Sequence, residues 1–112
     1  MTTYLYVFRG GNIDNASPDE RQQHMARWGA WIAELGKQGA FKGGEPLEKE
    51  GKVVLGKSKS VTDGPFAEAK DVVGGYLLVE AKDLHHATEL ARGCPVFESE
   101  NGSVEVRPVA KM

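Results

Sequence analysis

The sequence has little of what would place it outside the cell or in a membrane. It holds a single cysteine, Cys94, which cannot form an internal disulfide and suits a reducing compartment. No apolar run approaches the roughly 20 residues that span a bilayer. The N-terminus, MTTYLYVFRG, lacks the charged segment and long apolar stretch of a signal peptide. We therefore expect a cytoplasmic protein with no membrane partner.

The charge balance is equally plain. Lys and Arg number 14 against 16 Asp and Glu, which gives a net charge of −2, and no long run of one sign occurs. Because binding to nucleic acid or to an anionic membrane needs a basic patch, we expect neither partner. With 112 residues, of which 40% are hydrophobic, the chain fits one globular domain over residues 1–112 with one core.

Motifs for metals and cofactors are also missing. His85 and His86 are adjacent, so on a helix they point about 100° apart and cannot easily chelate one ion. No second cysteine or histidine stands at a zinc-like spacing. The glycines at 10–11 and 43–44 match neither phosphate-binding pattern. We predict no metal site and no cofactor.

The secondary-structure pattern predicts strand, helix, hairpin, strand, helix, strand. The segments are a strand over 3–9, a helix from the Ser17 cap to about Gly36, a hairpin of KVVLG and KSVT with its tip near Lys57-Ser58, a strand over 72–80, a helix from the Asp83 cap to Gly93, and a final strand in SVEVRPV. The stretch KQGAFKGGEPLEKEG is expected to be a polar connection. This order is typical of a ferredoxin-like split βαβ, α+β fold in which two helices cover one face of an antiparallel sheet.

Apolar side chains are expected on both faces of the first strand. Leu5 and Val7 point to one face, and Tyr4, Tyr6 and Phe8 to the other. We expect the face without helices to carry aromatics. Since each large apolar side chain left in water costs roughly 1.5 to 3 kcal/mol, a homodimer packed sheet to sheet is expected.

The helices are expected to bury an apolar stripe each. In the first helix the stripe is Met25, Trp28, Ile32 and Leu35, and in the second it is Leu84, Ala87, Leu90 and Ala91. The cysteine follows the end of the second helix, where a thiolate is not favoured, so we expect it to be a buried small hydrophobe.

Asp63 lies in VTDGPFAEAK, where Asp, Gly and Pro encode a stiff corner. One interpretation is a general base or an acceptor that orients a substrate. The other is a turn in which the carboxylate binds backbone N–H groups, which would lower its pKa. Both stay open at this point.

His24 is the histidine that the spacing places at the edge of the first helix's apolar face, beside Trp28 and Trp31. An imidazole there is a natural proton carrier. The alternative is a histidine at the core edge that only satisfies a backbone partner.

The segments GGEPLE, VTDGPFAEAK, VGGYLLVE and VEVRPV, in this order, resemble the DGPF group of the YCII-related domain family over nearly the whole chain. The resemblance implies a ferredoxin-like fold and dimers of the α+β barrel type. It also implies an active site of one histidine on a helix and one aspartate, which fall here on His24 and Asp63.

These observations favour a homodimer that binds a small organic molecule or acts on it without a cofactor, by proton transfer, elimination or isomerisation. The candidate catalytic residues are His24 and Asp63. The candidate substrate-binding residues are Trp28, Phe66, Tyr76 and Arg107, since aromatic rings can wall a pocket and an arginine can hold a carboxylate. The alternative is a non-catalytic dimeric interaction or regulatory domain, because no unambiguous catalytic constellation is present.

Overall fold

The computed structural model describes residues 1–11, 13, 15–64 and 71–112. Within them the elements, in chain order, are the strand β1 (Thr2–Arg9), the helix α1 (Pro18–Lys37), the strands β2 (Phe41–Pro46), β3 (Gly51–Leu55), β4 (Ser60–Gly64) and β5 (Val73–Ala81), the helix α2 (Leu84–Ala91), the short 3-10 helix η2 (Pro95–Glu98) and the strand β6 (Ser103–Pro108).

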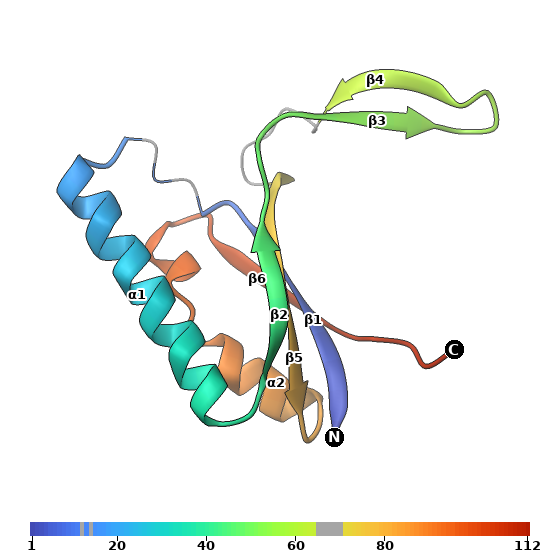
Figure 1. The fold of residues 1–112 in the computed structure, drawn as a ribbon. Coiled ribbons are helices and arrows are strands. Elements are labelled where there is room, and N and C mark those ends of the chain that lie inside the picture. Colours follow the sequence, from blue (N-terminus) through green and yellow to red (C-terminus); the bar gives the residue numbers. More distant parts are fainter. Residues whose placement is uncertain (12, 14, 65–70) are drawn as a thin grey trace.

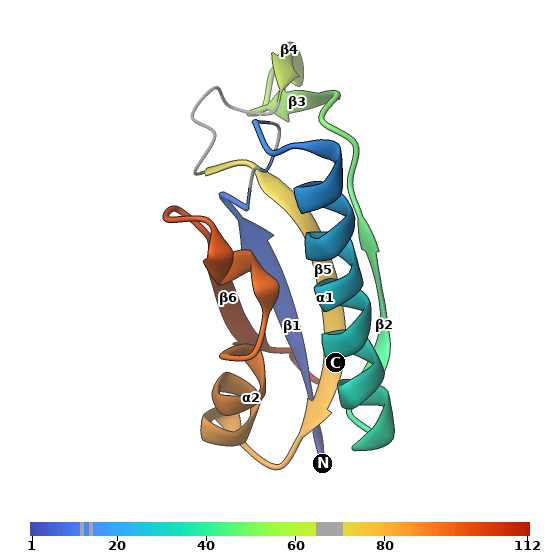
Figure 2. The ribbon, with the colours of Figure 1, turned by 90° about the vertical axis from the view of Figure 1, so that its left-hand side faces the viewer.

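Four strands form one antiparallel sheet in the order β2-β5-β1-β6, and both α-helices lie against the same face of it (Figures 1 and 2). This confirms the predicted ferredoxin-like α+β fold, of the dimeric α+β barrel type. The predicted hairpin is also confirmed, but β3 and β4 form a separate sheet of two strands. Figure 1 shows this hairpin projecting from the body on the side away from the helices.

The core is an aromatic cluster between β1 and α1. Tyr6 stacks on Trp31 with ring centroids 6.2 Å apart, and the Phe8 ring meets Trp28 edge to face at 5.0 Å. Offset and edge-to-face geometries are the favourable ones for aromatic pairs, worth about 0.5 to 1.5 kcal/mol each beyond burial. These contacts tie the first strand to the long helix.

The expectation that aromatics cover the uncovered face was wrong for the first strand. Tyr4, Tyr6 and Phe8 face the helices and are buried. The tryptophans of α1 supply the partners of Tyr6 and Phe8. On the uncovered face, four large half-buried apolar residues are paired across β1 and β5: Leu5 with Leu78, and Val7 with Tyr76.

The start of α1 is as predicted. The Ser17 hydroxyl accepts a hydrogen bond from the Glu20 amide at 3.1 Å, and Pro18 stands at the first helical position. The helix ends at Lys37, one residue past Gly36. Met25, expected in the core, is 62% exposed. The buried face of the helix contains its neighbour His24 instead, together with Trp31 and Leu35.

β2 was not predicted, since its sequence, FKGGEP, has little β propensity. One of its two glycines has a steric reason. Gly44 has a φ of +157°, and a Cβ atom there would lie 2.3 Å from the Tyr76 carbonyl oxygen. Gly75 opposes this strand, and a Cβ there would lie 2.9 Å from the Glu45 carbonyl oxygen, so the two backbones approach closely at this point.

The second helix begins at the predicted cap, where the Asp83 carboxylate accepts from the His86 amide at 2.8 Å. Ala87 and Ala91 are buried as expected, but Leu84 is 50% exposed, so its place in the core was wrong. Small residues let α2 approach the sheet closely enough for the Tyr6 hydroxyl to donate to the Ala87 carbonyl.

No helix in the described residues is long and apolar enough to cross a membrane.

Candidate functional site

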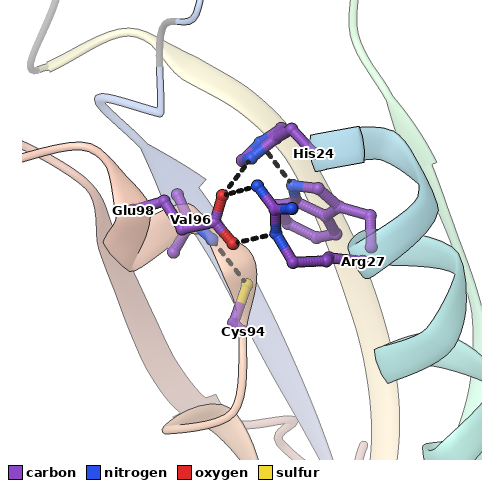
Figure 3. Close-up of polar contacts among 6 residues, drawn as sticks. His24, Arg27, Cys94, Val96 and Glu98 are labelled. Atoms are coloured by element: carbon purple, nitrogen blue, oxygen red, sulfur yellow. Dashed lines mark hydrogen bonds and ion pairs between the residues drawn. The ribbon is translucent and has the colours of Figure 1, made fainter. Parts of the chain in front are cut away.

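His24 is buried at 6% exposure, and both of its ring nitrogens have partners (Figure 3). Nδ1 lies 2.9 Å from the Glu98 Oε1 atom, and Nε2 accepts a hydrogen bond from the Trp28 indole N–H at 2.9 Å. The helix positions the histidine and the tryptophan together because residues four apart share a helix face.

These two bonds settle the tautomer of His24. An indole N–H can only donate, so Nε2 must present its lone pair to Trp28. An ionised carboxylate can only accept, so Nδ1 carries the hydrogen and donates it to Glu98. The imidazole is therefore neutral in this arrangement, and a proton can reach Nε2 only after the Trp28 bond has opened.

Glu98 also binds Arg27 through a two-pronged ion pair (Figure 3). Arg27 Nε donates to Oε2 at 2.7 Å, and its Nη2 donates to Oε1 at 2.6 Å. The hydrogen bond from Arg27, followed by that from His24, lowers the pKa of Glu98 from 4.5 to about 2. The glutamate is consequently a fixed negative charge beside the imidazole.

The segment before Glu98 explains how it reaches α1. Cys94 caps η2, where its Sγ atom accepts from the Val96 amide at 3.4 Å, and Pro95 begins the turn. The prediction that Cys94 is buried is confirmed, at 3% exposure. Burial raises the pKa of its thiol to about 12, which removes it as a nucleophile at neutral pH.

An open hollow of about 520 Å³ lies between α1 and η2. Its lining includes the ion pair of Arg27 and Glu98. The other lining residues are mostly apolar: Ala30, Trp31, Gly93, Cys94, Pro95 and Phe97. Phe97 is 49% exposed there. The hollow thus offers an apolar surface next to a paired carboxylate and guanidinium, and Glu98 links it to the histidine.

Asp63 has a different environment. It lies in β4 on the projecting hairpin, its side chain is 89% exposed, and its carboxylate pairs with the Lys52 ammonium across the strand pair. A second shallow hollow, of about 420 Å³, is lined by Glu50, Gly51, Lys52, Asp63 and Gly64. Neither ring nitrogen of His24 has Asp63 as its partner within the chain.

The remaining predicted residues fall into three places. Trp28 lies at His24, as described. Tyr76 and Arg107 lie in β5 and β6 on strand positions that face away from the helices, and Arg107 is exposed beside Glu105. Phe66 lies outside the described residues. Within one chain, the sheet separates Tyr76 and Arg107 from His24.

Sequence reasoning missed Arg27 and Glu98. Arg27 follows His24 by three residues and so shares its helix face, a spacing that was available as a signal. Glu98 is 74 residues from His24, in a short 3-10 helix that has no clear pattern. Among the described residues no group of three His, Cys, Asp or Glu side chains is placed to hold a metal ion.

The fold and this buried histidine, oriented by a paired glutamate, define an α+β protein of the dimeric α+β barrel type with a polar cluster between α1 and η2. The sequence matches the YCII-related domain over residues 5–112, so the chain belongs to the YCII-related domain family.

A protein of Rhizobium meliloti (strain 1021), named as uncharacterized, is 42% identical over 50 residues, which are 45% of this chain. The match spans 40% of the length of that relative. Among solved structures, a 5-chloro-2-hydroxyhydroquinone dehydrochlorinase (TftG) from Burkholderia phenoliruptrix AC1100, in complex with 2,5-dihydroxybenzoquinone, is similar with a TM-score of 0.55. The likeness covers 98% of this chain and 95% of that one at 17% identity, so it shows a shared fold.

Proposed function

We propose that this chain binds a small organic molecule and transfers a proton on it without a cofactor, with His24 as the acid or base. The observation that carries the proposal is the His24 Nδ1 to Glu98 contact of 2.9 Å at a buried imidazole. A base held by a carboxylate in this way is pre-oriented, and the negative charge stabilises the imidazolium that forms when Nε2 takes a proton.

In this proposal Glu98 orients the imidazole of His24. Its low pKa keeps it ionised across the neutral range, so it holds the Nδ1 hydrogen rather than taking it. Arg27 keeps the carboxylate in place through two bonds. In one chain Asp63 is engaged with Lys52, and its part in a site remains a prediction.

The reacting atom is Nε2, so Trp28 must release it. The indole N–H occupies the lone pair that would accept the substrate proton. We propose that a bound molecule breaks this hydrogen bond, packs against the apolar face of the Trp28 indole, and gives its proton to Nε2. In an isomerisation the imidazolium returns the proton to another atom of the substrate; in an elimination it passes the proton to water as the leaving anion departs.

The assembly proposed with this activity is a homodimer that packs through the uncovered sheet face. An apolar stripe on that face is partly exposed to solvent in a single chain. It consists of Leu5, Val7, Tyr76 and Leu78. Such a stripe on a sheet favours burial against a second sheet.

The test uses 2,5-dihydroxybenzoquinone, the small molecule named with the structural neighbour, as probe. We expect the His24 ring and Trp28 indole signals to shift on titration by NMR, and the protein to speed deuterium incorporation into the probe's ring from D₂O. His24→Gln should lower both affinity and exchange rate at least tenfold. His85→Gln, at an exposed position in α2, should leave both unchanged. Binding and exchange that survive His24→Gln would refute the proposal.

One observation favours the non-catalytic alternative: both His24 nitrogens already have partners, so the residue could serve only to join α1 to η2. In that case the probe would neither bind nor exchange faster with the wild-type protein. His24→Gln would then lower only the free energy of unfolding.

A further inference from the structure

Among the described residues, no third strand pairs with the hairpin of β3 and β4, which forms an arm with exposed apolar side chains. Val54 and Val61 face each other across the strand pair and are 63% and 60% exposed, and Leu55 is 42% exposed. A pair of strands with no third strand and no helix beside it is marginally stable in water. The arm therefore needs a surface outside the described chain to cover its valines.

The shape of the molecule shows the arm's separation from the body. The radius of gyration is 15.5 Å, with principal extents of 45, 44 and 20 Å. A compact domain of this length has a radius of gyration of about 13 Å. Figure 1 shows the cause: the arm projects from the body, and the two form the limbs of an L.

The direction of the arm identifies what covers it. Figure 1 shows β3 and β4 extending away from the helices, so the arm stands over the space in front of the uncovered sheet face. That face is also apolar, with Leu5 and Leu78 paired at its centre. The two surfaces bound one concave corner, which a second copy of the same L fills by two-fold symmetry.

We propose that in the homodimer each β3–β4 arm packs its Val54 and Val61 face onto the second copy. The inference rests on the homodimer proposed above and adds the arm to its interface.

The dimensions agree with this assignment. Two sheets pack about 10 Å apart, whereas five residues of β3 extend about 17 Å, so the arm overlaps the second sheet. The four-stranded sheet alone projects about 450 Å², and one face of the arm adds about 170 Å². Stable interfaces bury about 800 Å² of accessible surface per partner. Because side chains make a surface uneven, its accessible area is larger than its flat projection. The arm thus brings a small sheet interface towards a stable size.

The proposal gives Asp63 a new location. Cross-strand pairs two residues apart along a strand share a face, so Lys52 and Asp63 stand on the same face of the arm as Val54 and Val61. When that face is covered, the Lys52 and Asp63 ion pair moves from water into the subunit interface. Asp63, the exposed first residue of the DGPF segment, then contacts the second copy.

The experiment compares oligomeric mass by light scattering over a dilution series. We expect the wild-type protein at twice 12.2 kDa, and Val54→Asp with Val61→Asp to weaken dimerisation at least tenfold. Met25→Asp is the matched control, because Met25 is 62% exposed on α1, away from the proposed interface. It should dimerise as the wild type does.

The outcomes separate the arm from the dimer. A wild-type mass of 12.2 kDa would refute both the homodimer and the arm. A dimer that survives the two valine substitutions but is broken by Leu5→Asp would keep the sheet interface and refute the arm.

An independent measurement needs no variant to fold. In a dimer mixed from isotope-labelled and unlabelled wild-type chains, we expect intermolecular NOEs from the Val54 and Val61 methyl groups. Their absence in a protein that is dimeric would overturn the proposal.

Discussion

His24 and Glu98 lie 2.9 Å apart although 74 residues separate them, and each completes the other's hydrogen bonding. The contact joins the long helix to the short turn before the last strand. It holds the imidazole in one orientation. Together with the bond from Arg27, it keeps the pKa of Glu98 well below its usual range.

The acid stability of the protein should depend on Glu98. Its pKa falls from 4.5 to about 2 on folding, so its contribution is complete above pH 4.5 and is lost as the pH falls from there to about 2. Urea unfolding at several pH values should show this loss. In Glu98→Gln the free energy of unfolding should vary less over the same window.

Glu100→Gln is the control for that measurement, since Glu100 is exposed two residues further on. An equal acid sensitivity in the wild type and Glu98→Gln would contradict the assignment.

The tautomer of His24 is open to direct observation. We expect ¹⁵N NMR near pH 7 to show a protonated Nδ1 and an unprotonated Nε2, because the Trp28 N–H points at the latter. Trp28→Phe keeps an aromatic ring against Phe8 but removes the donor, so it should shift the Nε2 signal and leave the Nδ1 signal nearly unchanged. A wild-type protein with hydrogen on Nε2 would disprove this arrangement.

Tyr6 should contribute to stability through its hydroxyl as well as its ring. The hydroxyl donates to the Ala87 carbonyl in a buried setting, and burial raises its pKa to about 12. Tyr6→Phe should therefore cost about 1 kcal/mol in the free energy of unfolding, as measured by urea denaturation. Tyr76→Phe, on the uncovered face, should change it by less; equal losses would argue against the buried bond.

Two glycines should respond to alanine with opposite signs. Gly29 lies inside α1, and an added Cβ would meet nothing within 4 Å, so Gly29→Ala should raise the free energy of unfolding by about 1 kcal/mol. Gly44→Ala should lower it by about 3 kcal/mol, because the new Cβ would collide with the Tyr76 carbonyl. Thermal unfolding of both variants gives the signs, and a stable Gly44→Ala protein would contradict the contact.

Cys94 should be nearly inert in the folded protein. Its exposure is 3% and burial raises its pKa to about 12, so at pH 8 neither access nor thiolate is available. Its reaction with a thiol reagent should be slow and should accelerate in urea together with unfolding. Fast reaction in the native state would show that η2 opens on its own.

Local patterns were enough for the elements with local causes. Ser17 and Asp83 cap the helices as predicted, since a cap depends on a few neighbouring residues. The order of elements along the chain was enough for the ferredoxin-like fold class. β2 was missed, because Gly44 serves a close approach to β5 that exists only after the strands have paired.

The sequence by itself determined that His24 would stand at the edge of the apolar face of the first helix, near Trp28, because helical periodicity assigns each residue a direction. Only the tertiary structure decided that its carboxylate partner is Glu98, which no spacing relates to it, and that Asp63 stands on an exposed arm. The reason is that a contact between distant segments depends on how whole elements pack, and the chain pattern within each element does not carry that information.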